Sequence, residues 1–180
     1  YDNAGNILSS TDYNGVTTTY KYDSLDRMTE KSVGGEVTAY SYTVGGMLSS
    51  VTDKSGTTSF EYDIMDGLTQ KTLPDGTVLN YTYDSSGRIT KIATPYGNTS
   101  YEYDLLDRIT RVIDKNGNAT VYEYDANGNR TAVKYANGIT TTYSYDDLNR
   151  LISEETLDKD SNIVAKYIYT LGLSGERTKV

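Results

Sequence analysis

A doublet of aromatic residues with the spacing Tyr-x-Tyr returns along the whole chain at nearly constant intervals. Counting from Tyr1, the second residues of successive doublets are separated by 21, 20, 20, 21, 20, 21, 21 and 24 residues. The doublets are Tyr20 and Tyr22, Tyr40 and Tyr42, Phe60 and Tyr62, Tyr81 and Tyr83, Tyr101 and Tyr103, Tyr122 and Tyr124, Tyr143 and Tyr145, and Tyr167 and Tyr169. A fixed period of this length is the signature of a repeat protein. We therefore expect a single array over residues 1–180, of about eight repeats with a stump at each end.

An acidic turn follows most doublets. Six aspartates directly follow a second tyrosine, namely Asp23, Asp63, Asp84, Asp104, Asp125 and Asp146. Four arginines stand four residues further on, namely Arg27, Arg88, Arg108 and Arg150. An aspartate that opens a turn accepts hydrogen bonds from backbone N–H groups two residues later. The tyrosine, aspartate and arginine columns are therefore expected to be structural, with the arginines offsetting repulsion between neighbouring aspartates.

A second turn falls about ten residues after the first and contains pairs such as Asn116-Gly117 and Asn137-Gly138. Asn-Gly between β-rich runs is a strong hairpin signal. In the strand that leads into the doublet, Thr18, Tyr20 and Tyr22 alternate onto one face. The strand that leaves it has one apolar column, six residues past each second tyrosine, and otherwise mixed polarity. That column is Ile7, Met28, Leu48, Leu68, Ile89, Ile109 and Leu151, with Arg130 as the exception.

These patterns predict an all-β fold of tandem repeats of about 20–21 residues, each with two antiparallel strands. Open twisted sheets rarely exceed about ten strands. An array of about seventeen strands is therefore expected to form a long curled or spiralling sheet.

Composition excludes several kinds of function. The net charge of −8 argues against a nucleic-acid partner, because that affinity comes from clustered basic residues. Histidine and cysteine are absent, and the carboxylates are accounted for by turns, so we expect no enzyme activity, cofactor or metal site. Asp158 to Asn162 begins like a calcium loop, but Ile163 stands where glycine is required. No apolar run approaches the roughly 20 residues of a membrane span.

The repeated pattern Tyr-x-Tyr-Asp-x-x-[Gly/Asp/Asn]-[Arg/Asn], followed by an apolar residue and a Thr/Ser-rich run, resembles the YD-repeat (Rhs-repeat) family over all 180 residues. That family includes Rhs toxins, bacterial wall-associated proteins, shell components of insecticidal toxin complexes and teneurins. The resemblance implies that the sheet is part of a hollow shell or barrel-like wall. It further implies a non-catalytic segment of a large secreted or cell-surface protein, whose shell encloses or carries a C-terminal effector or toxin.

The chain starts within a repeat, so we expect it to be a fragment of a longer protein, and its Asn-Gly-rich turns favour a bacterial source. The expected partners are neighbouring repeats of the same polypeptide, an encapsulated effector, or a second sheet edge in edge-to-edge self-association.

An alternative is an extracellular glycan-binding or adhesive fibre module that presents tyrosines to cell-surface glycans. Three tyrosines outside the columns, Tyr13, Tyr96 and Tyr135, lie near expected hairpin tips and are the candidate glycan contacts. The column tyrosines would be the core of a thin sheet in a shell, but several would be open to solvent in a glycan-binding surface.

Overall fold

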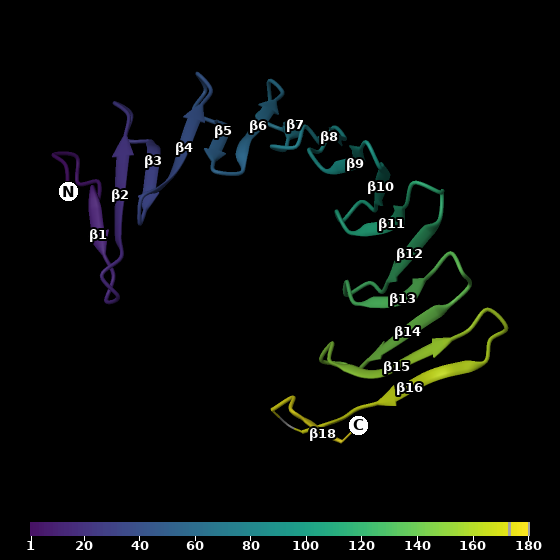
Figure 1. Cartoon of the computed structure of the whole chain (residues 1–180). Helices are drawn as coiled ribbons and strands as arrows, with labels where there is room; N and C mark the ends of the chain where they lie inside the picture. The colour runs from purple at the N-terminus through teal and green to yellow at the C-terminus, as the bar shows by residue number, and fades with distance from the viewer. Residues whose placement is uncertain (173, 180) are drawn as a thin grey trace. The chain divides into compact units, whose positions relative to one another are not determined.

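The structure is a computed structural model that describes residues 1–172 and 174–179. Within these ranges the chain consists of β-strands joined by short turns, without a helix (Figure 1). It divides into two compact units, Tyr1–Gly87 with Ile92–Tyr96, and Arg88–Lys91 with Gly97–Val180. The predicted all-β repeat fold is confirmed.

The first unit contains strands β1 to β8, which pair with one another antiparallel in sequence order. Their bounds are β1 Ser9–Thr11, β2 Thr17–Tyr22, β3 Met28–Val33, β4 Glu36–Tyr42, β5 Leu48–Asp53, β6 Gly56–Tyr62, β7 Leu68–Thr72 and β8 Val78–Tyr83. The next strand, β9 Ile89–Thr94, is divided between the two units.

The second unit repeats this arrangement with β10 to β16, again antiparallel and in sequence order. Their bounds are β10 Gly97–Tyr103, β11 Ile109–Ile113, β12 Ala119–Tyr124, β13 Arg130–Lys134, β14 Thr140–Tyr145, β15 Leu151–Leu157 and β16 Ile163–Ile168. A short ladder of its own joins β17 Thr170–Leu171 to β18 Arg177–Lys179. Each repeat therefore supplies two antiparallel strands, as the sequence predicts.

A β-bulge recurs where the doublet strand meets the strand that follows it. Between β2 and β3, Lys21 pairs with Glu30 but Tyr22 pairs with Met28, so that Thr29 is the extra residue. The same shift occurs at the ends of β4, β6, β10, β12 and β14. One extra residue reverses the face on which later side chains point. The bulge therefore explains the mixed polarity of the strand that leaves the doublet.

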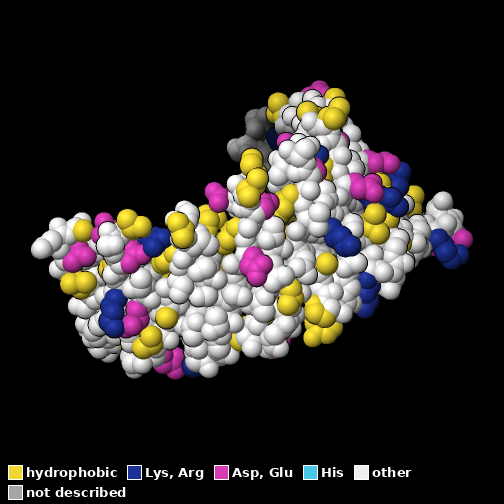
Figure 2. Space-filling view, turned by 90° about the horizontal axis from the view of Figure 1, so that it is seen from above, with side chains coloured by type: hydrophobic (Ala, Val, Ile, Leu, Met, Phe, Trp, Pro, Cys, Tyr) yellow, Lys and Arg dark blue, Asp and Glu magenta, His cyan; other side chains and the backbone are white. Residues whose placement is uncertain are grey.

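The two faces of the sheet differ in chemistry. On one face the first tyrosine of a doublet stands opposite a long or apolar side chain, as Tyr122 does opposite Val133. The other face carries exposed ion pairs, such as Lys21 with Glu30 at 2.9 Å. Figure 2 shows hydrophobic side chains in small groups separated by polar surface.

Burial is shallow in both units. Among the described residues, only Ala132, Val133 and Thr141 are buried. The doublet aromatics are half-buried, apart from Tyr167, which is 47% exposed. Each strand packs mainly against its neighbours in the sheet, and within the described residues no second layer covers these rings. The aromatic residues therefore form a thin, partly open core.

The repeats have two kinds of turn, at opposite ends of the strands. We call the end that follows the doublet the tyrosine end and the opposite end the far end. At the tyrosine end the turn has a constant form: the Asp23 N–H donates to the Arg27 carbonyl at 2.9 Å, and the Asp26 N–H donates to the Asp23 carbonyl at 3.1 Å. Asp26 takes a left-handed conformation with φ of 59°. In the other turns that follow a doublet, the equivalent residue is glycine, asparagine or aspartate.

Far-end turns vary in length. Gly34–Gly35 and Lys54–Ser55 are two-residue loops. The turns that open at Leu73, Asp114 and Tyr135 are closed by a hydrogen bond between that residue and the one four positions later. Repeats with the two-residue loops are 20 residues long and those with the longer turns are 21. The one-residue variation in the period is therefore absorbed at the far end.

Candidate functional site

The aspartate column builds the turns of the tyrosine end. Asp23 Oδ1 accepts hydrogen bonds from the backbone N–H of Leu25 at 2.9 Å and of Arg27 at 3.0 Å. Its other oxygen, Oδ2, accepts from Arg27 Nε at 2.8 Å. The carboxylates of Asp104 and Asp146 are engaged in the same way by Arg108 and Arg150. Each of these carboxylates thus fixes its own turn and holds an arginine in place.

These hydrogen bonds keep the carboxylates ionised. The side-chain hydrogen bond from Arg27 lowers the pKa of Asp23, and the one from Asn129 lowers the pKa of Asp125. For Asp146 the backbone N–H of Arg150 has the largest effect in lowering the pKa. Hydrogen bonds to the charged form favour that form. At neutral pH these three carboxylates are therefore fixed anions and not proton donors.

The second tyrosine of seven of the eight doublets ties its repeat to the preceding one. The Tyr42 hydroxyl donates to the backbone carbonyl of Met28 at 2.7 Å, and the Tyr124 hydroxyl donates to that of Ile109 at 2.8 Å. The same bond joins Tyr22 to Ile7, Tyr62 to Leu48, Tyr83 to Leu68, Tyr103 to Ile89 and Tyr145 to Arg130. The acceptor is always the backbone of the apolar column, which explains why Arg130 can replace an apolar residue there.

The arginine column ties the repeats in the opposite direction, toward the following turn. The Arg108 guanidinium lies over the ring of Tyr124, 4.6 Å from its centroid, and donates to the carbonyl of Asp125 at 3.2 Å. Arg27 makes the same contacts with Tyr42 and with the carbonyl of Thr43. Such a contact combines cation–π attraction with a charge-assisted hydrogen bond.

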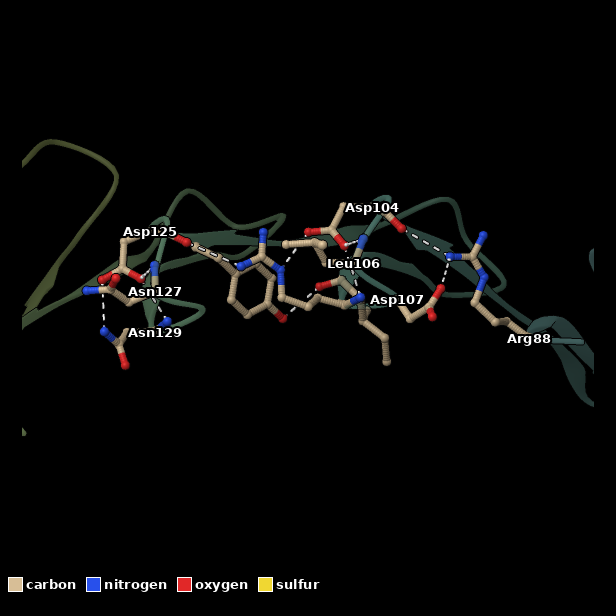
Figure 3. Close-up of polar contacts among 10 residues, drawn as sticks. Arg88, Asp104, Leu106, Asp107, Asp125, Asn127 and Asn129 are labelled. Carbon is tan, nitrogen blue, oxygen red and sulfur yellow. Dashed lines mark hydrogen bonds and ion pairs between the residues drawn. The ribbon is translucent and has the colours of Figure 1, made fainter. Parts of the chain in front are cut away.

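Arg88 follows this pattern and adds an ion pair. Its guanidinium lies 4.8 Å from the centroid of the Tyr103 ring and donates to the carbonyl of Asp104 at 3.0 Å. It also reaches the Asp107 carboxylate at 2.7 Å, in the same turn as Asp104 (Figure 3). Arg150 donates to the carbonyl of Gly172 at 3.2 Å.

Asparagine replaces arginine in some turns and makes a shorter link. Asn129 Nδ2 donates to Asp125 Oδ2 at 2.9 Å and to Asn149 Oδ1, in the next turn, at 2.8 Å (Figure 3 shows Asn129 beside Asp125). Asn6 links Asp2 to Asp26 in the same way. Met47 and Gly67 occupy this position in two other turns and offer no polar group.

The first aromatic of each doublet lies two residues earlier on the same strand face. Tyr20, Tyr40, Phe60, Tyr101, Tyr122 and Tyr143 stand opposite Lys31, Val51, Lys71, Val112, Val133 and Glu154. Arg130 lies over the Tyr143 ring, 4.9 Å from its centroid. Tyr81 lies in β8, and Tyr167 and Tyr169 flank Ile168 at the end of β16. Arg177 lies 4.0 Å from the centroid of the Tyr169 ring.

The three tyrosines outside the columns, Tyr13, Tyr96 and Tyr135, lie at the far end on three different hairpins. They are 97%, 73% and 44% exposed. Glycan binding by them stays a prediction.

The described part of the chain contains no group of three or more acidic side chains placed to hold a metal ion. Asp158 instead accepts hydrogen bonds from the backbone N–H groups of Asp160 and Asn162, at 2.9 and 2.8 Å, as a turn residue. None of the described segments is a helix of the length and apolarity needed to span a membrane.

The sequence did not predict two features of the tyrosine end: the hydroxyl-to-carbonyl bond and the guanidinium group over the ring of the next repeat. The hydroxyl bond does not constrain the type of the acceptor residue, because the acceptor is a backbone carbonyl. The guanidinium contact could have been inferred from the constant spacing of four residues between aspartate and arginine.

Comparison with known proteins bears on the fold and the family. The crystal structure of TcdB2-TccC3-TEV is similar in fold, with a TM-score of 0.81 and 16% identity over 98% of this chain and 11% of that chain. The crystal structure of TcdB2-TccC3-Cdc42 matches with a TM-score of 0.74 and 16% identity over 88% of this chain and 10% of that chain. The chain thus spans about a tenth of the length of these similar chains.

Sequence comparison gives the family. No curated protein matches the sequence significantly. The RHS repeat model matches residues 103–140 and 124–160. The teneurin YD-shell model matches residues 1–99, more than half of the chain. Together with the repeated tyrosine–aspartate turns, this match shows that the chain belongs to the teneurin YD-shell family.

Proposed function

We propose that this chain is a wall segment of a YD shell: a non-catalytic structural array within a larger secreted or surface-delivered protein, whose shell encloses or carries a C-terminal effector. One observation carries the proposal. At seven of the eight doublets, from Tyr22 to Tyr145, a tyrosine hydroxyl bonds the repeat to the backbone of the preceding one. A bond that recurs from repeat to repeat serves the array and not a local site.

A thin wall needs such bonds, because it has little buried core. Three described residues are buried, so apolar burial contributes less than in a two-layer domain. A net hydrogen bond contributes about 0.5–1.5 kcal/mol, and stability in a repeat array is close to a sum over repeats and the interfaces between neighbours. Small links that recur at each interface therefore stabilise the whole array.

The enclosing role draws support from the similar solved structures. One of them is TcdB2-TccC3 without hypervariable C-terminal region, which places such a region in that protein; it matches with a TM-score of 0.75 over 88% of this chain. We extend this arrangement to the present chain as part of the proposal.

Catalysis and glycan binding are less well supported. The carboxylates of Asp23, Asp104 and Asp146 are engaged by N–H groups of their own turns, which leaves them poorly placed as general bases. Arginine guanidinium groups cover a face of the rings of Tyr42 and Tyr124. A sugar-binding platform would need such faces open.

The test is protease protection of the complete polypeptide that contains residues 1–180. We expect its C-terminal segment to resist a protease that digests the same segment expressed alone. A variant with Tyr103→Phe, Tyr124→Phe and Tyr145→Phe removes three links and should lower this protection. The control, Tyr13→Phe and Tyr135→Phe, changes two exposed tyrosines outside the columns and should leave it intact. Equal digestion of the free and enclosed segment would contradict the enclosing role.

A further inference from the structure

Arginine fills the same space between consecutive turns in several repeats. The floor of this space is the ring of a second tyrosine, its far wall is the carbonyl of the residue after that tyrosine, and its near wall is the aspartate of the preceding turn. Arg27 and Arg108 fill it with guanidinium groups 4.6 Å from the ring centroids of Tyr42 and Tyr124. The aspartates beside them, Asp23 and Asp104, are 23% and 22% exposed.

One turn of the first unit has the same walls but lacks the arginine. Asp63 opens this turn and accepts hydrogen bonds from the N–H groups of Met65 and Gly67, both at 2.8 Å. Gly67 stands four residues after Asp63, at the position that Arg27 and Arg108 occupy in their turns. Tyr83 provides the ring, and its hydroxyl is bonded to the carbonyl of Leu68 at 2.8 Å as in the other repeats.

A pocket occupies the place of the missing side chain. It has a volume of about 360 Å³ and is lined by Asp63, Asp66, Gly67, Tyr83 and Asp84 among others. That volume falls within the range of about 300–1,000 Å³ typical of small-ligand sites. Asp63, unlike Asp23 and Asp104, is an exposed residue. The pocket therefore exposes an aspartate and an aromatic ring of the kind that Arg27 and Arg108 cover in their own repeats.

The charge of this pocket also differs from that of its sister sites. Within the described residues, neither the Asp63 nor the Asp66 carboxylate forms an ion pair. The equivalent of Asp66 in the second unit, Asp107, is neutralised by Arg88 at 2.7 Å. In the turn before Asp66 the corresponding residue is Met47, which carries no charge. Burial and the nearby Asp63 carboxylate together raise the pKa of Tyr83. The pocket is therefore anionic and has an aromatic floor.

We propose that the pocket between the Asp63–Gly67 turn and Tyr83 is a binding site for a guanidinium group supplied from outside the chain, such as the arginine side chain of another polypeptide. The group would lie over the Tyr83 ring, donate to the Asp84 carbonyl and pair with the Asp63 carboxylate. Arg27 and Arg108 make these same three contacts at their own sites. The site goes beyond the wall role and does not depend on it.

The geometry selects guanidinium over ammonium. Guanidinium is planar, stacks on an aromatic face and offers several donors in one plane, so that it can reach a carboxylate and a carbonyl together. An ammonium group is more strongly hydrated and cannot stack in this way. Discrimination between the two cations is thus the property that a general acidic patch would lack.

The first experiment is a titration of the isotopically labelled chain with methylguanidinium, followed by amide NMR. We expect saturable shifts confined to residues 63–67 and 83–87, with a dissociation constant of roughly 1–30 mM. Methylammonium should bind at least about threefold more weakly.

A peptide such as acetyl-Gly-Arg-Gly-amide serves as the second probe. Tighter binding of the peptide than of methylguanidinium indicates a polypeptide ligand, and equal binding indicates a free small guanidinium compound. Arg88 and Arg108 already occupy the spaces over the Tyr103 and Tyr124 rings. The Asp104–Arg108 turn is therefore the internal control and should not respond.

Two variants test the assignment further. Gly67→Arg should fill the pocket from within and abolish binding. A Cβ at Gly67 would lie 2.8 Å from Asp63 Oδ2, a carboxylate oxygen at the end of a side chain that can rotate. Asp63→Asn keeps the oxygen that caps the turn and removes the charge, and should weaken binding about threefold or more.

The reverse variant, Arg27→Gly, should create a second site beside Tyr42. Non-saturable shifts spread over all turns, equal binding of methylguanidinium and methylammonium, or unchanged binding in a folded Gly67→Arg variant would each overturn the proposal.

Discussion

The tyrosine end and the far end hold neighbouring repeats together by different means. At the tyrosine end, long polar side chains bridge the space between turns, as Arg108 and Tyr124 do. At the far end the turns meet where a side chain is missing. A Cβ at Gly138 would lie 2.7 Å from the Cβ of Lys159, and one at Gly56 would lie 2.9 Å from the Cβ of Pro74. One end therefore depends on the side chains it has, and the other on those it lacks.

The largest effect is expected from closing the far-end contact with Gly138→Ala. Gly117 is the matched control, because both glycines have φ of 84° in turns of the same hydrogen-bonding form, but the space around Gly117 is open. Gly117→Ala should lower the free energy of unfolding by about 1–2 kcal/mol through the left-handed conformation alone. Gly138→Ala should lower it by about 1–3 kcal/mol more, because of the clash with Lys159. Urea unfolding of both variants measures the difference, and equal losses would show that close packing at the far end is unimportant.

Removing one hydroxyl at the tyrosine end should have a smaller effect. Tyr124→Phe leaves the Ile109 carbonyl without its donor and should lower the free energy of unfolding by about 1 kcal/mol. Tyr122 lies on the same strand, and the structure gives its hydroxyl no hydrogen bond to any described residue. Tyr122→Phe should therefore change stability by less than about 0.5 kcal/mol. The same unfolding measurement tests both, and a larger loss in Tyr122→Phe would contradict the assigned role of the second tyrosine.

Replacing a bridging arginine with lysine sharpens the comparison further. Arg108→Lys keeps the charge but loses the stacking on Tyr124, and should lower the unfolding free energy by about 0.5–1 kcal/mol. Arg111 is the control, since it forms an exposed ion pair with Glu102 at 3.3 Å. Arg111→Lys should stay within about 0.5 kcal/mol of the wild type. If the two variants lose the same stability, the guanidinium plane at Arg108 has no special role.

Acid should weaken the aspartate turns gradually. The folded-state pKa of Asp125 is lowered, so its contribution to stability is full above the ordinary carboxyl pKa and is lost as the pH falls through the folded value. Asp125→Asn keeps an acceptor oxygen but does not titrate. The stability difference between wild type and this variant should therefore shrink as the pH falls from about 5 to about 3. Urea unfolding at a series of pH values would show it, and a constant difference would mean that the Asp125 charge adds nothing to the turn.

The sequence predicts the period, the strands and both sets of turns, because each depends on local chemistry. Asp23 and Gly128 can be placed in turns from their residue types alone, since aspartate caps backbone N–H groups and glycine accepts positive φ. The alternation of Thr18, Tyr20 and Tyr22 likewise gives the face of β2. These features need no knowledge of neighbouring repeats.

Features that depend on contacts between neighbouring repeats could not be predicted from the sequence. Thr29 is the extra residue of a bulge, but threonine is equally common at regular positions of these strands, so its residue type does not mark the bulge. Gly117 and Gly138 both follow asparagine, yet only Gly138 closely approaches another hairpin. The Tyr145 hydroxyl binds the backbone of Arg130, whose side chain gives no hint of it. Each feature is fixed by the distance between repeats, which no local pattern records.

The confinement of length variation to the far end has a practical consequence for engineering. A peptide grafted into the Gly34–Gly35 or Lys54–Ser55 loop would extend the hairpin at the end where natural repeats already differ in length. The hydroxyl and guanidinium links at the opposite end of the strands would keep their register. The far-end loops are therefore natural insertion points for an epitope or a label, and the Asp23–Arg27 type of turn is the place to leave untouched.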